Sequence, residues 1–151
     1  MMKSPLDTML NIAGTTVESF QQVEGYICLH IKMLNRGMQC PYCQRYTEKL
    51  HQTTYILARD LPSFGQPVYL KVPRRRFYCR RCQKYSTERL DFMDWQQVHT
   101  QRYEQNIYQR VLASNVEQVS REEGLTGEEI EAIFWRVNQT VKKKIGVGLN
   151  D

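Results

Sequence analysis

Residues 40–82, CPYCQRYTEKLHQTTYILARDLPSFGQPVYLKVPRRRFYCRRC, contain two C-x-x-C pairs, Cys40/Cys43 and Cys79/Cys82. The residues between the pairs, 44–78, have room for two strands and a loop. Each pair lets two thiolates converge from one tight turn, and two such turns together supply the tetrahedral set of four sulfurs that zinc prefers. We therefore predict a zinc ribbon holding one structural zinc ion.

Three other uses of these cysteines are weighed against zinc. A redox C-x-x-C usually stands alone beside a βαβ unit, which this sequence lacks, and an odd total of five cysteines argues against a disulfide framework. An iron site with the same four ligands stays open, although no redox partner is evident. Cys28 lies outside the pattern, and we expect it to be a packing residue.

The chain carries no feature of a secreted or membrane protein. No apolar run approaches the roughly 18 residues of a membrane helix, and the N-terminal stretch MMKSPLDTMLNI has no small-residue cleavage site. We expect a soluble cytoplasmic protein without a membrane partner. In that reducing compartment paired cysteines are more often metal ligands than disulfides.

Positive charge is concentrated in the middle of the chain. Residues 36–89 carry 12 basic and 3 acidic side chains, whereas residues 1–35 carry 2 and 3, and residues 90–151 carry 7 and 10. Such a distribution suits a polyanionic partner. The basic stretch KVPRRRFYCRRCQKY supplies six predicted DNA contacts, interleaved with Phe77 and Tyr78: Arg74, Arg75, Arg76, Arg80, Arg81 and Lys84.

Alternating apolar residues predict strands before and within the cysteine region. We expect a short helix at residues 5–12 and a hairpin over 15–34 that turns at Glu24-Gly25. Between the cysteine pairs we expect two strands joined by Ser63-Phe64-Gly65. Because proline cannot donate to a strand ladder, Pro67 and Pro73 predict that the second strand lies partly at a sheet edge.

From about Tyr103 onward the apolar residues recur at helical spacing. The segment NVEQVSREEGLTGEEIEAIFWRVNQ has the layout of a helix-turn-helix, in which Gly124 supplies the turn and Thr126 caps the second helix. A helical hairpin without a DNA role has the same features, and the acidic residues that begin the second helix disfavour phosphate contact. Five residues farther along are predicted to contact DNA: Arg136, Asn138, Gln139, Lys142 and Lys143.

These patterns predict an α+β protein, a small zinc ribbon with β-hairpins followed by an all-α helix-turn-helix module. We expect three parts. Residues 1–35 form an N-terminal helix and β-hairpin, residues 36–90 form the four-cysteine ribbon, and residues 100–145 form the helix-turn-helix.

The order of these parts resembles the N-terminal half of bacterial insertion-sequence transposases of the ISL-three type. The resemblance rests on Cys40-Pro41-Tyr42-Cys43, Arg59-Asp60-Leu61-Pro62, the run Arg74 to Cys79, Cys82, and Thr87-Glu88-Arg89. It covers roughly residues 36–140. In that family the N-terminal modules are thought to recognise terminal inverted repeats, and a DDE-type catalytic domain follows.

The resemblance implies a zinc-dependent DNA-binding part of a transposase, acting on double-stranded DNA in the bacterial cytoplasm and associated with the nucleoid when bound. It implies a chain that lacks the catalytic domain, so no catalytic residues are assigned and no enzyme activity is expected. Its further partners would be a second copy of itself or a full-length transposase. A transcriptional regulator built from the same parts and a protein-interaction or oligomerisation module stay open as alternatives.

Overall fold

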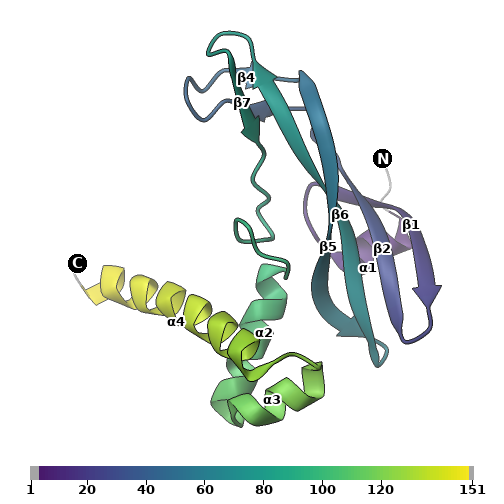
Figure 1. The fold of residues 1–151 in the computed structure, drawn as a ribbon, viewed down its shortest axis with the longest axis vertical. Coiled ribbons are helices and arrows are strands. Elements are labelled where there is room, and N and C mark those ends of the chain that lie inside the picture. The colour runs from purple at the N-terminus through teal and green to yellow at the C-terminus, as the bar shows by residue number, and fades with distance from the viewer. Residues whose placement is uncertain (1–3, 150–151) are drawn as a thin grey trace. The chain divides into compact units, whose positions relative to one another are not determined.

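The computed structural model describes residues 4–149, with side chains as far as residue 145, and it divides into two compact units between Thr100 and Gln101. The first unit consists mainly of strands and the second of helices, which confirms the α+β class (Figure 1). In the first unit the elements are α1 (Pro5–Leu10), β1 (Thr15–Val23), β2 (Tyr26–Met33), β3 (Met38–Gln39), β4 (Tyr46–Thr47), β5 (Leu50–Ser63), β6 (Gln66–Cys79) and β7 (Lys84–Thr87). The second unit contains α2 (Gln101–Ala113), α3 (Val116–Glu123) and α4 (Gly127–Leu149).

A long antiparallel hairpin, β5 and β6, dominates the first unit. Each strand has 14 residues, and the turn between them is formed by Phe64 and Gly65, both with positive φ, as a two-residue hairpin turn requires. Figure 1 shows the hairpin running from the end with β4 and β7 to the end with α1 and β1. One end of the hairpin therefore lies with the short strands β4 and β7, and the other end lies with α1 and β1.

Away from the cysteines, β5 and β6 belong to a sheet with the order β1-β2-β6-β5. β2 pairs with β6 in parallel over residues 27–30 and 68–71, while β1 and β2 form the expected hairpin with Gly25 at the turn. One face packs on a core of buried residues from α1, the sheet and the segment after β7: Leu10, Ile31, Ala58, Val68, Leu70, Val72 and Met93. The division into domains at residue 35 stays a prediction, although β1 and β2 share a sheet with β6.

The expectation that the second strand lies partly at a sheet edge is confirmed at Pro67 and Pro73, neither of which pairs with β2 or β7. β6 is central, with β5 on one side along most of its length and β2 and then β7 on the other. Pro67 precedes the residues that pair with β2, and Pro73 lies between the stretches 68–71 and 76–79, where β6 has no strand partner on that second side. These positions accommodate residues that lack an N–H group.

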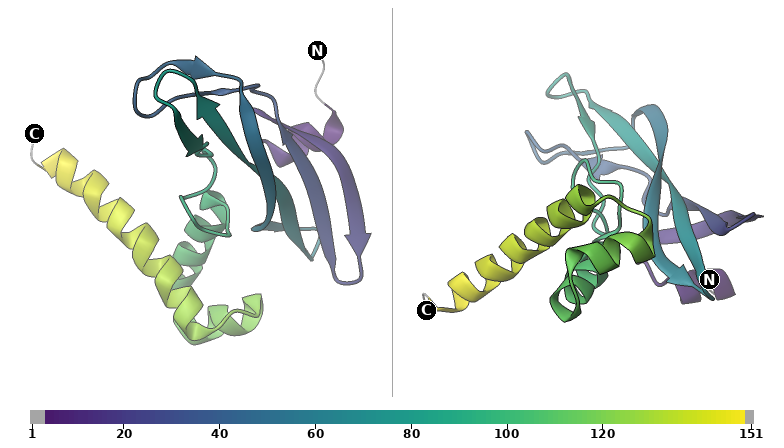
Figure 2. Two further views of the ribbon diagram at one scale, coloured as in Figure 1. Left: turned by 45° about the horizontal axis from the view of Figure 1, so that its top comes forward. Right: turned by 60° about the horizontal axis from the view of Figure 1, so that its bottom comes forward.

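The second unit is a three-helix bundle. Its core consists of Tyr103, Ile107, Val119, Ile130 and Ile133, close to the periodic set expected from the sequence, whereas Leu112 is exposed. Gly124 ends α3 in the left-handed conformation and the Thr126 hydroxyl accepts from the Glu129 amide, both as expected, and Asn115 caps the start of α3. Figure 2 shows α4 as one continuous helix that extends past α2 and α3.

No helix in the described part of the chain combines the length and the apolar character needed to cross a membrane.

The short β3–β4 hairpin depends on a glycine. A Cβ placed on Gly37 would lie 2.1 Å from the carbonyl oxygen of Thr47, which is backbone and cannot move aside. We predict that Gly37→Ala destabilises the first unit by about 1–3 kcal/mol, the usual cost of overpacking. Thermal unfolding checks this. Gly127→Ala is the control, since its Cβ would meet only Val116 Cγ1 at 3.8 Å, and an unchanged Gly37→Ala melting temperature contradicts the prediction.

Candidate metal centre and nucleic-acid interface

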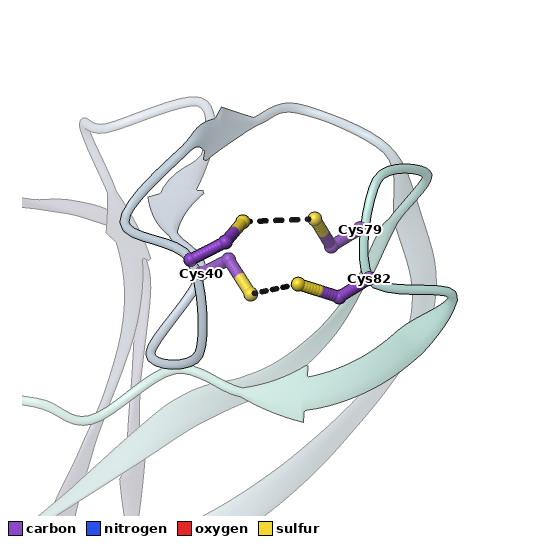
Figure 3. Close-up of side chains that lie close together, drawn as sticks. Cys40, Cys79 and Cys82 are labelled. Carbon is purple, nitrogen blue, oxygen red and sulfur yellow. Dashed lines mark hydrogen bonds between the residues drawn. The ribbon is translucent and has the colours of Figure 1, made fainter.

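The two C-x-x-C turns have the same local structure. In each turn the residue after the second cysteine has positive φ, 65° at Gln44 and 56° at Gln83. The amide of that residue donates to the carbonyl of the first cysteine, Cys40 or Cys79, at 2.8 Å in both turns. Figure 3 shows the cysteine side chains of the two turns pointing toward one another from opposite sides. Local hydrogen bonding thus orients two thiols from each turn into one site.

The four sulfurs have the separation that a tetrahedral zinc site requires. Cys40 Sγ lies 3.8 Å from Cys82 Sγ, Cys43 Sγ lies 3.7 Å from Cys79 Sγ, and all four atoms lie within 4.8 Å of one another. Zinc–sulfur bonds of about 2.3 Å in a tetrahedron place the sulfurs about 3.8 Å apart. The cysteines are free of disulfides, with Cys40 and Cys79 buried. The residues therefore fit one zinc ion, and four protein ligands make the site structural.

The thiols differ in acidity because they share hydrogen bonds. Burial alone raises the pKa of Cys40, but hydrogen bonds from the amides of Cys43 and Tyr42 and from neighbouring thiols outweigh it and lower the pKa to about 7. The hydrogen bond with Cys43, followed by burial, raises the pKa of Cys82 to about 12. A divalent cation compensates the charge of four clustered thiolates, which is the chemistry this site needs.

The three consecutive arginines after Pro73 do not share one environment. Side chains alternate between the faces of a strand, so Arg75 lies on the same face as buried Phe77, over whose ring its guanidinium sits at 5.2 Å. Arg75 Nε contacts Glu88 at 2.6 Å, and the two side chains are only 13% and 6% exposed. Asn35 also donates to this carboxylate. Arg75, expected to contact DNA, is thus engaged inside the first unit.

The other basic residues of the ribbon lie beside aromatic rings or in solvent. Arg76 lies over Tyr85 at 5.0 Å and Lys84 over Tyr42 at 4.2 Å, and both cations are exposed. Half-buried Arg74 lies over Trp95, as does Arg89. Arg80 and Arg81 are exposed within the second cysteine turn. Except for Arg75, the predicted residues of the ribbon are therefore at least partly accessible.

Two of the predicted contact residues on α4, both partly exposed, are bonded to side chains of α2. Arg136 Nη2 lies 2.6 Å from Glu104 Oε2, and Glu104 is 2% exposed. The Asn138 side chain accepts from the Tyr108 hydroxyl at 3.4 Å. The sequence contained no signal for either pairing, because both require α2 and α4 to pack side by side. Arg136 and Asn138 lie on the flanks of α4 and contribute to the bundle.

Three residues predicted to contact DNA lie on the exposed face of α4. Trp135, which the sequence analysis did not single out, lies on the same face. Gln139, Lys142 and Lys143 are exposed, and Trp135, one turn before Gln139, is 55% exposed. Residues spaced by three, four and seven positions lie on one side of a helix, here the side opposite buried Ile130 and Ile133. Helical spacing from the core positions could have placed Trp135 on this face.

A four-cysteine zinc ribbon followed by a helix-turn-helix bundle defines a class of zinc-containing protein with nucleic-acid-binding modules. The family described as "zinc-finger of transposase IS204/IS1001/IS1096/IS1165" matches residues 36–82. The family described as "Helix-turn-helix domain of transposase family ISL3" matches residues 88–138. Residues 36–82 and 88–138 therefore match the zinc-finger and helix-turn-helix domains of ISL3 transposases, which confirms the resemblance drawn from the sequence.

One curated relative agrees with this assignment. The transposase for insertion sequence element IS1001 from Bordetella parapertussis is 36% identical over 95 residues, which are 63% of this chain. The match covers 23% of that transposase. No solved structure matches the chain.

We predict that Cys82→Ala abolishes stoichiometric zinc binding and unfolds the ribbon, because a structural zinc site contributes about 10–16 kcal/mol. Metal analysis and circular dichroism of the purified chain check this. The matched control is Cys28→Ala, which removes a buried cysteine outside the site and should keep one equivalent of zinc. Full zinc content in Cys82→Ala would contradict the assignment of this ligand.

Arg75→Ala should act on stability first. Removing one partner of a buried ion pair leaves the other charge uncompensated and costs about 3–5 kcal/mol. The expected result is a lower melting temperature of the first unit, measured by thermal unfolding. Arg76→Ala, at the adjacent exposed position, is the control and should change the melting temperature by no more than about 2–4 °C, since exposed substitutions change stability by about 0.5 kcal/mol.

Proposed function

We propose that this chain binds duplex DNA at the terminal inverted repeats of an insertion sequence, as the DNA-binding part of an ISL3-type transposase. The observation that carries the proposal is the presence, in one chain, of both N-terminal modules of this transposase family in the family's order. Double-stranded DNA of a bacterial cell is the expected partner, which places the protein in the cytoplasm. A second copy or a full-length transposase would assemble with it on the element ends.

The two modules have different roles in this binding. The ribbon contributes exposed cations, Arg76, Arg80, Arg81 and Lys84, which position the protein on phosphates without reading sequence. α4 contributes the exposed face that carries the Gln139 amide, the Trp135 indole and the ammonium groups of Lys142 and Lys143. Amide side chains can form two hydrogen bonds with the edge of an adenine, so Gln139 is the residue suited to direct reading.

The acidic start of α4 limits which part of the helix can contact DNA. Glu128, Glu129 and Glu131 are exposed there and repel phosphates. We therefore place the contact from Trp135 onward, where the exposed face becomes neutral and then basic at Lys142 and Lys143. An exposed indole at the centre of this surface can pack on thymine methyl groups or on sugars.

Within this proposal residues 36–143 bind DNA, and the cleavage and joining of strands belongs to other parts of such a transposase. No catalytic family is among the matches. The chain by itself is then expected to occupy element ends without cutting them.

We predict that Gln139→Ala changes the preferred DNA sequence, whereas Lys142→Ala weakens binding to all sequences alike and lowers the salt dependence by about one phosphate contact. Selection of bound duplexes from a random pool, followed by salt titrations, checks both. Gln105→Ala removes the same amide from an exposed position of α2 and is the matched control. Binding that does not weaken as salt rises would refute the DNA-binding proposal itself, because neutralised phosphates release counterions.

A further inference from the structure

A basic hollow lies beside the metal centre. Its volume is about 530 Å³, and its cations come from two separate segments, Arg45 and Lys49 around β4, and Arg80 and Arg81 in the second cysteine turn. All four cations are exposed. Arg45 and Lys49 lie outside the basic run of residues 74–84, so charge clustering along the sequence did not single them out.

The walls of this basic hollow are fixed by hydrogen bonds. The Thr47 hydroxyl donates to the carbonyl of Tyr78 at 2.7 Å, and the Tyr78 amide donates to the carbonyl of Lys49 at 2.9 Å. The Cys40 amide donates to the carbonyl of Arg45 at 2.8 Å. The segment that carries Arg45 and Lys49 is therefore held both to β6 and to the first cysteine turn.

The cations of the basic hollow have no ionic partner of their own. Among the described residues none of the four forms an ion pair, although Glu48 lines the same hollow. The carboxylate of Glu48 instead accepts from the Tyr46 hydroxyl at 3.2 Å. Partial desolvation, and then this hydrogen bond, raise the pKa of the Tyr46 phenol.

The metal centre does not account for all of this positive charge. One zinc ion and four thiolates carry a net charge of −2, and Glu48 adds one more negative charge. Four cations around the hollow exceed these three negative charges. This excess of positive charge on exposed groups makes the hollow attractive to an anion.

We propose that the basic hollow binds a backbone phosphate of duplex DNA, contacted by Arg45 and Lys49 on one wall and by Arg80 and Arg81 on the other. This inference rests on the proposed function and adds a contact that joins the β4 segment to the DNA. Guanidinium groups bind phosphate oxygens through two parallel hydrogen bonds, and Lys49 adds a mobile point charge. The hollow fixes the register of the ribbon on the duplex.

The test uses the full zinc-loaded chain and a fluorescein-labelled duplex selected from the random pool. The double variant Arg45→Gln/Lys49→Gln should weaken binding by about tenfold at 0.1 M salt and lower the slope of log affinity against log salt by about 0.9 for each phosphate that the protein no longer neutralises. Lys32→Gln, which removes one exposed charge on β2 outside the hollow, measures the effect of one lost charge, and the double variant should lower log affinity by more than twice that effect. Zinc content and zinc affinity are measured on every variant.

A second measurement identifies the phosphate. Duplexes with a single neutral methylphosphonate are tested in turn, and the position that weakens wild-type binding should have no further effect on the double variant. A double variant that keeps wild-type affinity and slope overturns this inference and leaves the proposed function standing. A loss of affinity that is the same at every phosphate position, or a change in zinc affinity alone, also overturns it. Wild-type binding without salt dependence refutes both.

Discussion

The ribbon depends on one constraint: its two C-x-x-C turns must bring four sulfurs together in a single metal site. The apolar core of the first unit includes Ala58 and Val72 and ends there along the hairpin. Beyond them, toward the cysteines, Phe77 is the one buried aromatic ring in the described residues, while Tyr42, Tyr46 and Leu50 are exposed. Too little apolar surface is buried at this end to offset the entropy of ordering the chain. The metal centre replaces the missing core.

The long strand β6 takes part both in the apolar core of the sheet and in the metal-stabilised ribbon. It buries one face in the core and the opposite face in the ribbon. Val68, Leu70 and Val72 point into the core, whereas Phe77 and Cys79 are buried at odd positions and therefore on the opposite face. Pro73 lies between these two sets, where the strand has no second partner. The ribbon is thus an extension of the same hairpin with a separate interior, and a distortion there need not disturb the sheet below it.

Sequence spacing predicted the features that depend on neighbours along the chain. The cysteine pairs, the Phe64-Gly65 turn, the Thr126 cap and the core positions of the three helices all follow from local patterns. The parallel pairing of β2 with β6 did not, because a parallel partner is distant in sequence and leaves no turn signal. Pro73 indicated correctly a local edge of the strand, but the sequence did not show that β2 and β7 cover the same side before and after it. The ion pairs Arg75–Glu88 and Arg136–Glu104 were missed because each joins segments that only tertiary packing brings together.

Charge along the sequence also did not show which cations are accessible in the folded chain, because that depends on tertiary packing as well. Arg75 lies between two accessible arginines, yet strand alternation turns it toward Phe77 and Glu88. Arg45 and Lys49 are isolated charges in the sequence, yet the hydrogen bonds of β4 bring them to Arg80 and Arg81. A cation contributes to phosphate binding only if it is accessible and has no internal partner, since a paired charge must first give up its ion pair. The fold therefore limits the cations available to a polyanion to those it leaves unpaired, and the two cysteine turns, held by the metal centre, position Arg80 and Arg81 among them.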